Sequence, residues 1–296
     1  MPEQSNLINT GVIGLGAMGS GMALNLYRQG ALTAAWNRTP EKVANLAAES
    51  GFPLLEQIGE VVQRSQLIIT CVSRDADLLE VIEQIAAGLT EEKTVLDTST
   101  VSVETARVAA RRVAARGAAF IDGPVSGGSE GARNGALVMM AGGEASTLDR
   151  LRPTLACFTR SVTHMGPVGA GQATKAVNQI MAAGINQAVT ESLAFGQAQG
   201  LDMQQVIEVI SGGAAGNWFL EHRGRSMLED RFEPGFKLAL HHKDLQICRR
   251  MMDAQGVCSP LLEMTLADYK VLLADGHGEE DISTLFQLKR HLYTNE

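Results

Sequence analysis

The sequence is poor in aromatic residues and has no excess of basic ones. Aromatic side chains make up 4% of the 296 residues, so a folded core has to be built from aliphatic side chains and methionine. Lysine and arginine number 25 against 33 aspartates and glutamates, which gives a formal net charge of −8. Nucleic-acid-binding proteins normally carry a basic face, so this balance argues against nucleic acid as a partner.

Cysteines and long apolar runs are also scarce. The four cysteines form no CxxC pair, which argues against a metal cluster or a disulfide framework. We expect Cys71, Cys157, Cys248 and Cys258 to be buried small hydrophobic residues in a reducing compartment. Residues 1–9 lack the pattern of a signal peptide, and no apolar run is long enough to span a bilayer. We therefore expect a cytoplasmic protein without a membrane segment.

The first half of the sequence alternates short apolar strands with amphipathic helices. A hydrophobic fraction of 45% is typical of a folded globular chain, and 296 residues suggest about two domains. The expected strands are residues 10–13, 32–36, 67–72, 94–97, 119–122 and 137–141. The expected helices are residues 18–28, 40–50, 77–87, 103–116 and 146–152, the last stopped or kinked by Pro153. This alternation predicts an α/β fold, a Rossmann-like doubly wound parallel sheet with helices on both faces.

The second half changes character after residues 162–164, beyond which no strand pattern is present. Residues 169–200 are predicted to form one long helix. Helical periodicity resumes in residues 203–210, 218–228, 238–255, 261–273 and 282–291. We therefore expect two domains, a nucleotide-binding domain at 1–165 and an all-α helical domain at 166–296.

A glycine-rich motif, GxGxxG, follows the first strand and opens the first helix. It consists of Gly14, Leu15, Gly16, Ala17, Met18 and Gly19. In this context the first glycine makes a tight turn, the second lets a pyrophosphate approach the backbone, and the third lets helix and strand pack closely. The free N–H groups of the helix N-terminus suit the phosphates. The motif predicts a dinucleotide cofactor.

The end of the second strand indicates which cofactor. NAD sites usually carry an acidic residue about 20 residues after the motif, but residues 19–40 contain none. Asn37, Arg38 and Thr39 occupy that place instead. The guanidinium of Arg38 offers a fork of donors suited to a 2′-phosphate, and its two neighbours can add hydrogen bonds. The sequence therefore predicts NADP(H) in preference to NAD(H).

Three further motifs follow in order, at residues 122–135, 169–179 and 243–245. With the N-terminal motif they make the chain resemble the β-hydroxyacid dehydrogenase family, which includes 3-hydroxyisobutyrate dehydrogenase and tartronate semialdehyde reductase. The resemblance covers nearly the whole chain. It implies a nucleotide-binding domain, a helical domain, and an active site between them that interconverts a small 3-hydroxy carboxylic acid and its semialdehyde or keto acid.

The resemblance also implies roles for individual residues. Lys175 matches the family's catalytic lysine, and a lysine in a dry cleft can act as both general acid and general base. Asn178, three residues on, can orient that lysine or bind substrate. The loop of Ser126, Gly127 and Gly128 matches the family's carboxylate-binding loop. The other implied positions are Thr100 for substrate and cofactor, Val72, Ser73 and Lys243 for the cofactor, and Trp218, Phe236 and Asp244 for the substrate.

Two of these loops depart from the family's pattern. Val103 stands where the family usually has proline, and Val72 with Ser73 replaces a common Leu-Pro pair. The detailed shape of both loops is therefore open.

Other interpretations remain. Residues 127–131 fit GxSxG, the nucleophile elbow of α/β-hydrolases, but they lie inside the longer motif. The histidines show no metal-ligand spacing, and nicotinamide chemistry needs no metal, so we expect none. Two alternative functions remain, an imine reductase of the same superfamily and a non-catalytic NADP-binding module. Imine reductases generally lack the lysine and the binding modules have it replaced, so the presence of Lys175 argues against both. The resemblance also implies a homodimer or homotetramer. We expect a small carboxylate substrate and neither nucleic acid nor a membrane as a partner.

Overall fold

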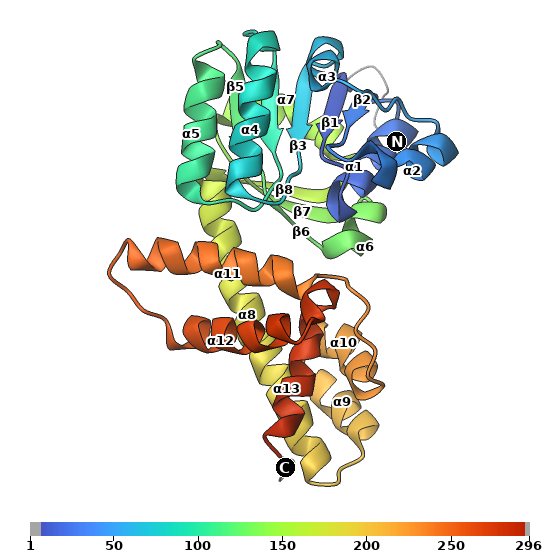
Figure 1. Ribbon diagram of the computed structural model, residues 1–296, viewed down its shortest axis with the longest axis vertical. Coiled ribbons are helices and arrows are strands. Elements are labelled where there is room, and N and C mark those ends of the chain that lie inside the picture. The colour runs from blue at the N-terminus through green and yellow to red at the C-terminus, as the bar shows by residue number, and fades with distance from the viewer. Residues whose placement is uncertain (1–6, 294–296) are drawn as a thin grey trace. The chain divides into compact units, whose positions relative to one another are not determined.

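The computed structural model describes residues 7–293. These divide into two compact units, of which the first ends at Lys175 and the second begins at Ala176 (Figure 1). The first is an α/β unit and the second is helical. The predicted boundary near Gly166 stays a prediction. Residues 1–6 of the predicted polar N-terminal stretch lie outside the described residues. None of the helices within 7–293 is long and apolar enough to cross a lipid bilayer.

The α/β unit is built on one eight-stranded sheet with the order β2-β1-β3-β4-β5-β7-β6, and β8 pairs with β7. The strands are β1 (Thr10–Ile13), β2 (Leu32–Trp36), β3 (Leu67–Thr70), β4 (Thr94–Asp97), β5 (Ala119–Asp122), β6 (Val125–Ser126), β7 (Leu137–Gly142) and β8 (Thr159–Gly166). Strands β1 to β5 are parallel, as predicted. Strand β7 runs antiparallel to β5 and β6, so the prediction of a wholly parallel sheet was wrong at this edge. The segment between β5 and β7 contains β6 and α6, and β7 returns along this edge antiparallel to both β5 and β6 instead of continuing the parallel order.

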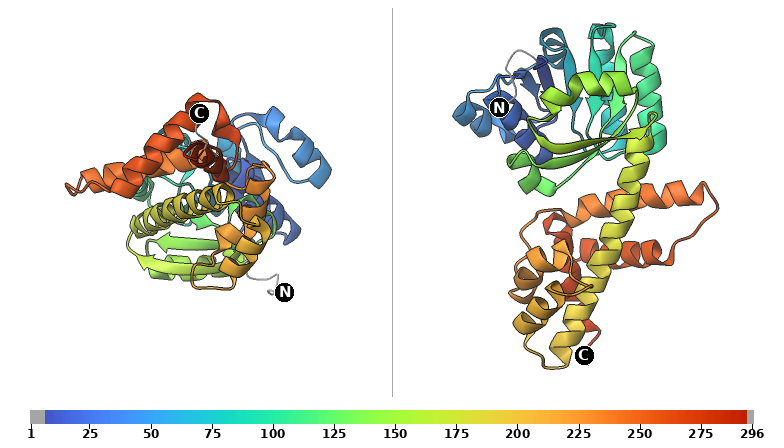
Figure 2. Two further views of the ribbon diagram at one scale, coloured as in Figure 1. Left: turned by 90° about the horizontal axis from the view of Figure 1, so that it is seen from below. Right: turned by 180° about the vertical axis from the view of Figure 1, so that it is seen from behind.

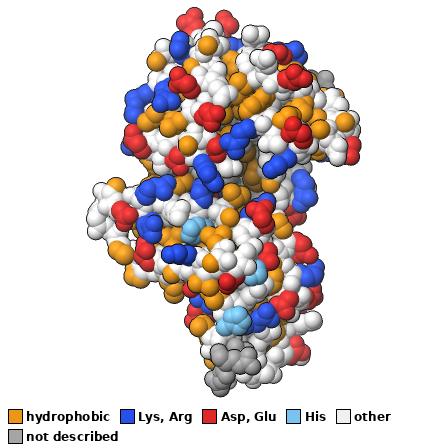
Figure 3. Space-filling view, viewed as in Figure 1, with side chains coloured by type: hydrophobic (Ala, Val, Ile, Leu, Met, Phe, Trp, Pro, Cys, Tyr) orange, Lys and Arg blue, Asp and Glu red, His pale blue; other side chains and the backbone are white. Residues whose placement is uncertain are grey.

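Helices cover both faces of this sheet because successive strand residues point to opposite sides. Val12 and Ile69 belong to one core, whereas Ile13 and Ile68 belong to the other. The first core includes α1 (Ala17–Arg28), α2 (Ala44–Ser50), α6 (Gly128–Arg133) and α7 (Ala145–Leu155). The second includes α3 (Ile58–Arg64), α4 (Asp75–Ile85), followed by a 3₁₀ turn (η3, Ala86–Gly88), and α5 (Val103–Ala114). Figures 1 and 2 show the two layers from opposite sides, and Figure 3 shows acidic and basic side chains interspersed over the second.

Two predicted helices of the α/β unit differ from the structure. The predicted helix 40–50 is a 3₁₀ turn (η2, Pro40–Lys42) followed by α2, because Val43 has φ −124° and ψ 0° and interrupts the helical backbone. The helix expected to stop or kink at Pro153 continues to Leu155. Leu151 and Leu155 are both buried, so their packing offsets the hydrogen bond that the proline cannot donate. Helices α3 and α6 and strands β6 and β8 were not predicted.

The helical unit contains most of the 29-residue helix α8 (Ala170–Ala198), which confirms the single long helix predicted for this part of the sequence. The other elements are α9 (Met203–Ser211), α10 (Trp218–Leu228), α11 (Leu238–Asp253), α12 (Pro260–Ala274), α13 (Leu285–His291) and the 3₁₀ turns η4 (His277–Glu279) and η5 (Ile282–Thr284). No strand follows β8 in the part of the chain that is described, as predicted. All these helices contribute to one apolar core around Tyr269 and Phe286.

The cysteines are less buried than predicted. Cys248 is buried, Cys71 and Cys157 are half-buried, and Cys258 is exposed. Cys258 lies in the turn between α11 and α12, where the chain has no core to pack against, so the expectation of four buried cysteines was wrong. All four are free thiols.

Candidate active site

The glycine-rich loop between β1 and α1 is tightly packed at two of its three glycines. Gly14 has φ +96°, and a Cβ there would lie 2.3 Å from the carbonyl oxygen of Cys71. A Cβ on Gly19 would lie 1.9 Å from the carbonyl oxygen of Gly14, so α1 and the loop touch directly. A Cβ on Gly16 would meet open space. The loop is therefore closed against the protein on one side and open to a ligand on the other.

Asn37 connects this loop to the end of β2. Its Oδ1 accepts a hydrogen bond of 2.9 Å from the backbone N–H of Leu15, and its Nδ2 donates to the carbonyl oxygen of Thr39. The first turn of α1 begins with exposed Ala17 and half-buried Met18, and the whole of this described turn contains no acidic residue. No acidic side chain of this turn therefore opposes an anion at its backbone donors, which fits the pyrophosphate of a dinucleotide. The residues present thus suit an NAD(P) cofactor.

Arg38 lies beside the same loop, and its side chain is 71% exposed. Its Nη1 lies 2.8 Å from Oδ1 of Asp77, which belongs to the first turn of α4. Nothing in the sequence indicated this pair, since 39 residues separate its members.

Asp97, at the end of β4, organises the next two loops. Its Oδ1 accepts hydrogen bonds from the hydroxyls of Thr70 and Ser99, at 2.8 and 2.7 Å. The Ser99 Oγ in turn accepts a bond from the backbone N–H of Val72. Asp97 therefore fixes both the loop of Val72 and exposed Ser73 and the loop that carries half-buried Thr100.

Asp122, at the end of β5, holds the start of α8. Its two carboxylate oxygens accept bonds from the backbone N–H groups of Gly169 (2.7 Å) and Gln172 (2.9 Å). The side chain of Gln172 donates to the carbonyl oxygen of Ser99 and accepts from the N–H of Val101. The first turn of α8 is thus joined to the end of β5 and to the loop of Thr100.

Burial raises the pKa of both aspartates. The pKa of Asp97 rises to about 7, because burial and the nearby charge of Asp122 outweigh the hydrogen bonds from Ser99 and Thr70. The pKa of Asp122 rises to about 6, because burial outweighs the bonds from Gly169 and Gln172. Within the described chain, Oδ2 of Asp97 is buried without a hydrogen-bond partner.

Lys175 lies one turn after Gln172 on α8 and is 7% exposed. Its Nζ donates a hydrogen bond of 2.8 Å to the carbonyl oxygen of Val125, across 50 residues. The next residue, Ser126, is half-buried, and Gly127 and Gly128 follow with φ +130° and +63°. The α/β unit therefore brings Lys175, the turn of residues 125–128 and the loop of Thr100 to the ends of β4, β5 and β6.

The remaining predicted residues belong to the helical unit. Nδ2 of Asn178 donates to the side chain of Gln179, and the amide of Gln179 donates to Oδ2 of Asp244 at 2.6 Å. Asp244 is buried and also lies 2.7 Å from the amine of Lys243. This geometry joins α8 to α11, so Lys243 and Asp244 are a partly buried pair rather than a solvated one.

The two predicted aromatic residues differ in exposure. Phe236 packs partly buried against the helical core, with its ring centroid 5.1 Å from that of His241. Trp218 is 56% exposed; its ring stacks on His222 at 4.2 Å, and Arg223 lies 5.4 Å from its centroid. Trp218 is therefore the more accessible of the two.

Sequence reasoning assigned no role to Asp77, Asp97, Asp122, Gln172 or Gln179. Asp97 and Asp122 carry a usable signal, because each is an acid at the carboxyl end of a buried parallel strand, where ligands of such sheets lie. Gln172 is part of a quoted motif, but its side-chain partners come from another part of the chain. Gln179 ends the same motif, but its partner Asp244 lies 65 residues further on. No pattern pointed to Asp77.

Comparison with known proteins agrees with this architecture. Residues 9–166 match the family model of the NAD-binding domain of 6-phosphogluconate dehydrogenase, and residues 169–289 match that of the NAD-binding domain of NADP-dependent 3-hydroxyisobutyrate dehydrogenase. The chain is 34% identical to a 2-hydroxy-3-oxopropionate reductase of Escherichia coli, over 94% of this chain and 95% of the relative. It is 31% identical to an NAD-dependent L-serine dehydrogenase of Pseudomonas aeruginosa, over 93% and 96%.

A solved structure shows the same likeness in three dimensions. The 3-hydroxyisobutyrate dehydrogenase of Mycobacterium tuberculosis, determined with L-serine, has a TM-score of 0.86 to this chain at 29% identity. The match covers 96% of this chain and 99% of that one.

The raised pKa of Asp97 predicts a pH dependence of stability. The folded state keeps the proton up to about pH 7, whereas the unfolded chain loses it near pH 4, so the contribution of Asp97 to stability falls as pH rises through this window. In Asp97→Asn this fall should be absent. Relative to the variant, the wild type should lose up to about 4 kcal/mol of unfolding free energy between pH 4 and pH 7, at 1.36 kcal/mol per pKa unit.

Urea titrations of both proteins across this range measure the difference. Asp253→Asn, which removes an exposed carboxylate at the end of α11, is the matched control and should follow the wild type. Parallel stability curves for the wild type and Asp97→Asn would contradict the assignment.

Proposed function

This chain belongs to the 3-hydroxyisobutyrate dehydrogenase-like family of β-hydroxyacid dehydrogenases, and on that premise we propose that it transfers hydride between NADP(H) and a small 3-hydroxy carboxylic acid or semialdehyde acid. Membership itself makes it an NAD(P)-dependent oxidoreductase. The observation that carries the proposal is the buried amine of Lys175, which lies 2.8 Å from the carbonyl oxygen beside Ser126.

In this proposal Lys175 moves the substrate proton. The cofactor, when bound, supplies or accepts hydride at the nicotinamide. Nζ of Lys175 takes the proton from the substrate hydroxyl during oxidation and returns it to the carbonyl oxygen during reduction. The bond to Val125 holds the amine at a fixed place, and burial excludes water from it. Asp122 and Gln172 act indirectly. They hold the start of α8, from which Lys175 projects one turn later.

The turn of residues 126–128 suits a carboxylate. Gly127 and Gly128 both have positive φ, a backbone arrangement that lets successive N–H groups face an anion. The hydroxyl of Ser126 adds a donor, and Thr100 lies on the neighbouring loop that Gln172 joins to α8. We assign substrate binding to these four residues. Asn178, Trp218, Phe236 and Asp244 stay predicted substrate residues, and Lys243 a predicted cofactor residue.

Arg38 supports NADP(H) as the preferred cofactor. Its guanidinium is exposed next to a loop whose open side faces outward at Gly16, and residues 19–40 offer no acid to a ribose hydroxyl. A 2′-phosphate would find a cation there, whereas the diol of NAD would find no acid within that segment. The cofactor residues of this proposal are Gly14, Leu15, Gly16, Ala17, Met18, Gly19, Asn37, Arg38, Thr39, Val72, Ser73 and Thr100.

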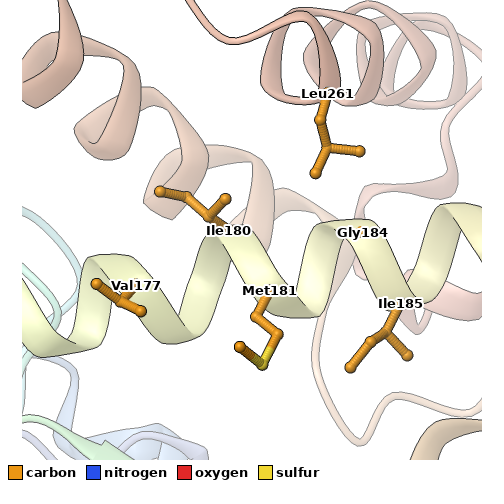
Figure 4. Close-up of a pocket in the computed structure, with 6 residues that line it drawn as sticks. All are labelled: Val177, Ile180, Met181, Gly184, Ile185 and Leu261. Atoms are coloured by element: carbon orange, nitrogen blue, oxygen red, sulfur yellow. The ribbon is translucent and has the colours of Figure 1, made fainter.

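An apolar surface of α8 supports self-association. Val177 and Met181 are 61% and 62% exposed, and with Ile180, Gly184, Ile185 and Leu261 they line an open pocket of about 450 Å³ (Figure 4). In the close-up, Leu261 of α12 points toward α8. Exposed apolar patches of this kind mark interaction sites. We propose that a second copy of the chain covers this surface in a homodimer or homotetramer.

Replacing Lys175 tests the proposed acid–base role. Lys175→Met keeps the length of the buried side chain but removes the amine, so turnover should fall by about 10²–10⁴-fold. NADPH binding, followed by fluorescence titration, should stay within about threefold of wild type. The control is Lys270→Met, which replaces an exposed lysine near the end of α12 and should keep full activity. Comparable turnover in Lys175→Met would remove Lys175 as the acid–base group.

A substrate panel tests the reaction class and the cofactor together. We expect NADPH oxidation with at least one of glyoxylate, tartronate semialdehyde, methylmalonate semialdehyde and succinic semialdehyde, and a higher kcat/KM with NADPH than with NADH. A preference for NADH would keep the class and overturn the cofactor assignment. Tight NADPH binding without turnover would favour an imine substrate or a non-catalytic binding module.

A charge placed in the apolar pocket tests the proposed self-association. Met181→Glu should lower the mass measured by light scattering in solution to that of a smaller assembly, because an unpaired carboxylate is costly to bury. The control is Val209→Glu on α9, which is 75% exposed and outside the pocket, and which should keep the wild-type mass. Unchanged mass in Met181→Glu would place the contact elsewhere.

A further inference from the structure

An acidic side chain is paired with the residue to which we assign cofactor choice. Oδ1 of Asp77 lies 2.8 Å from Nη1 of Arg38. The side chain of Asp77 is 19% exposed, whereas that of Arg38 is 71% exposed. Asp77 belongs to the first turn of α4, where backbone N–H groups favour a negative charge. A largely buried carboxylate therefore stands beside the exposed guanidinium.

The two acids in this turn of α4 have different partners. Oδ1 of Asp75 accepts bonds from the backbone N–H of Ser102 and the hydroxyl of Thr105, so Asp75 ties α4 to α5. Within the described chain, the interaction recorded for the Asp77 carboxylate is its ion pair with Arg38. The start of α4 is thus anchored by Asp75, and the carboxylate of Asp77 acts on the loop after β2.

This placement matters for a 2′-phosphate more than for a ribose diol. A guanidinium has five N–H donors, so Arg38 can hold Asp77 and a second anion at once. The doubly charged phosphate would then lie within a few ångströms of the Asp77 carboxylate and be repelled by it. The diol of NAD is uncharged and feels no such repulsion. Residues 19–40 contain no acid, but α4 supplies one that pairs directly with Arg38.

We propose that Asp77 is a cofactor-specificity residue: by holding and partly neutralising Arg38, it weakens binding of the 2′-phosphate and narrows the preference for NADPH over NADH. This inference rests on the proposed role of Arg38 in binding the 2′-phosphate, and it adds Asp77 as the group that weakens that binding. Because the guanidinium of the pair is exposed to solvent, removing the Asp77 charge should not unfold the protein.

Equilibrium binding of the two cofactors tests this without any substrate. Fluorescence titration of the full chain gives the Kd of NADPH and of NADH for the wild type and for Asp77→Asn. The variant should bind NADPH about tenfold more tightly, the size expected for one near-surface charge acting on a dianion. Its Kd for NADH should stay within about twofold of wild type. Glu80→Gln, which removes an exposed acid one turn further along α4, should change neither Kd.

Arg38→Ser separates failure of this inference from failure of the cofactor assignment. If Arg38→Ser weakens NADPH binding but Asp77→Asn leaves it equal to or weaker than wild type, the inference is wrong and Asp77 merely holds Arg38 in place. If Arg38→Ser has no effect on NADPH, the assignment of Arg38 fails, and the inference fails with it. In the double variant the gain from Asp77→Asn should shrink below about threefold, and an undiminished gain would also overturn the proposed pair.

Discussion

The hydrogen bonds that Asp122 accepts from Gly169 and Gln172 are the constraint on which the proposed site depends. They attach the first turn of α8 to the end of β5, and Lys175 projects from the next turn of the same helix. Gln172 extends the attachment to the loop after β4. Because both attachments are buried and a helix is stiff, the amine of Lys175 has a defined place beside Val125. The loop after β4, the turn at residues 125–128 and the start of α8 are thereby held in fixed positions relative to one another.

This precision has an energetic cost. Burial raises the pKa values of Asp97 and Asp122 to about 7 and 6, so keeping them ionised at neutral pH opposes folding. Both acids nevertheless organise loops through directed bonds to hydroxyl and backbone N–H groups. An apolar residue at either position would remove the electrostatic cost, but it would leave those donors without an acceptor. The two buried aspartates thus lower the stability of the fold at neutral pH but fix the loops around Lys175.

Much of the fold follows from local patterns. Buried strands such as Leu67–Thr70 are continuous apolar runs, and the 29-residue α8 contains no proline, so both were predictable. The wrong predictions, for α7 and β7, arose where packing or strand direction decided the structure. Helix α7 passes through Pro153 because Leu151 and Leu155 are both buried in the core, which propensity does not report. Strand β7 runs antiparallel to β5 and β6, and the spacing of apolar residues does not reveal strand direction.

The sequence by itself determined the class of site: the glycine motif, the absence of acid in residues 19–40, and the motif that contains Lys175 all follow from residue type and spacing. Only the tertiary structure decided which groups meet. The contacts of Lys175 with Val125, of Gln172 with Ser99 and of Arg38 with Asp77 join residues 39 to 73 positions apart. Such contacts depend on how neighbouring strands align and on where each helix begins, and those quantities are set by packing of the whole unit rather than by any one segment.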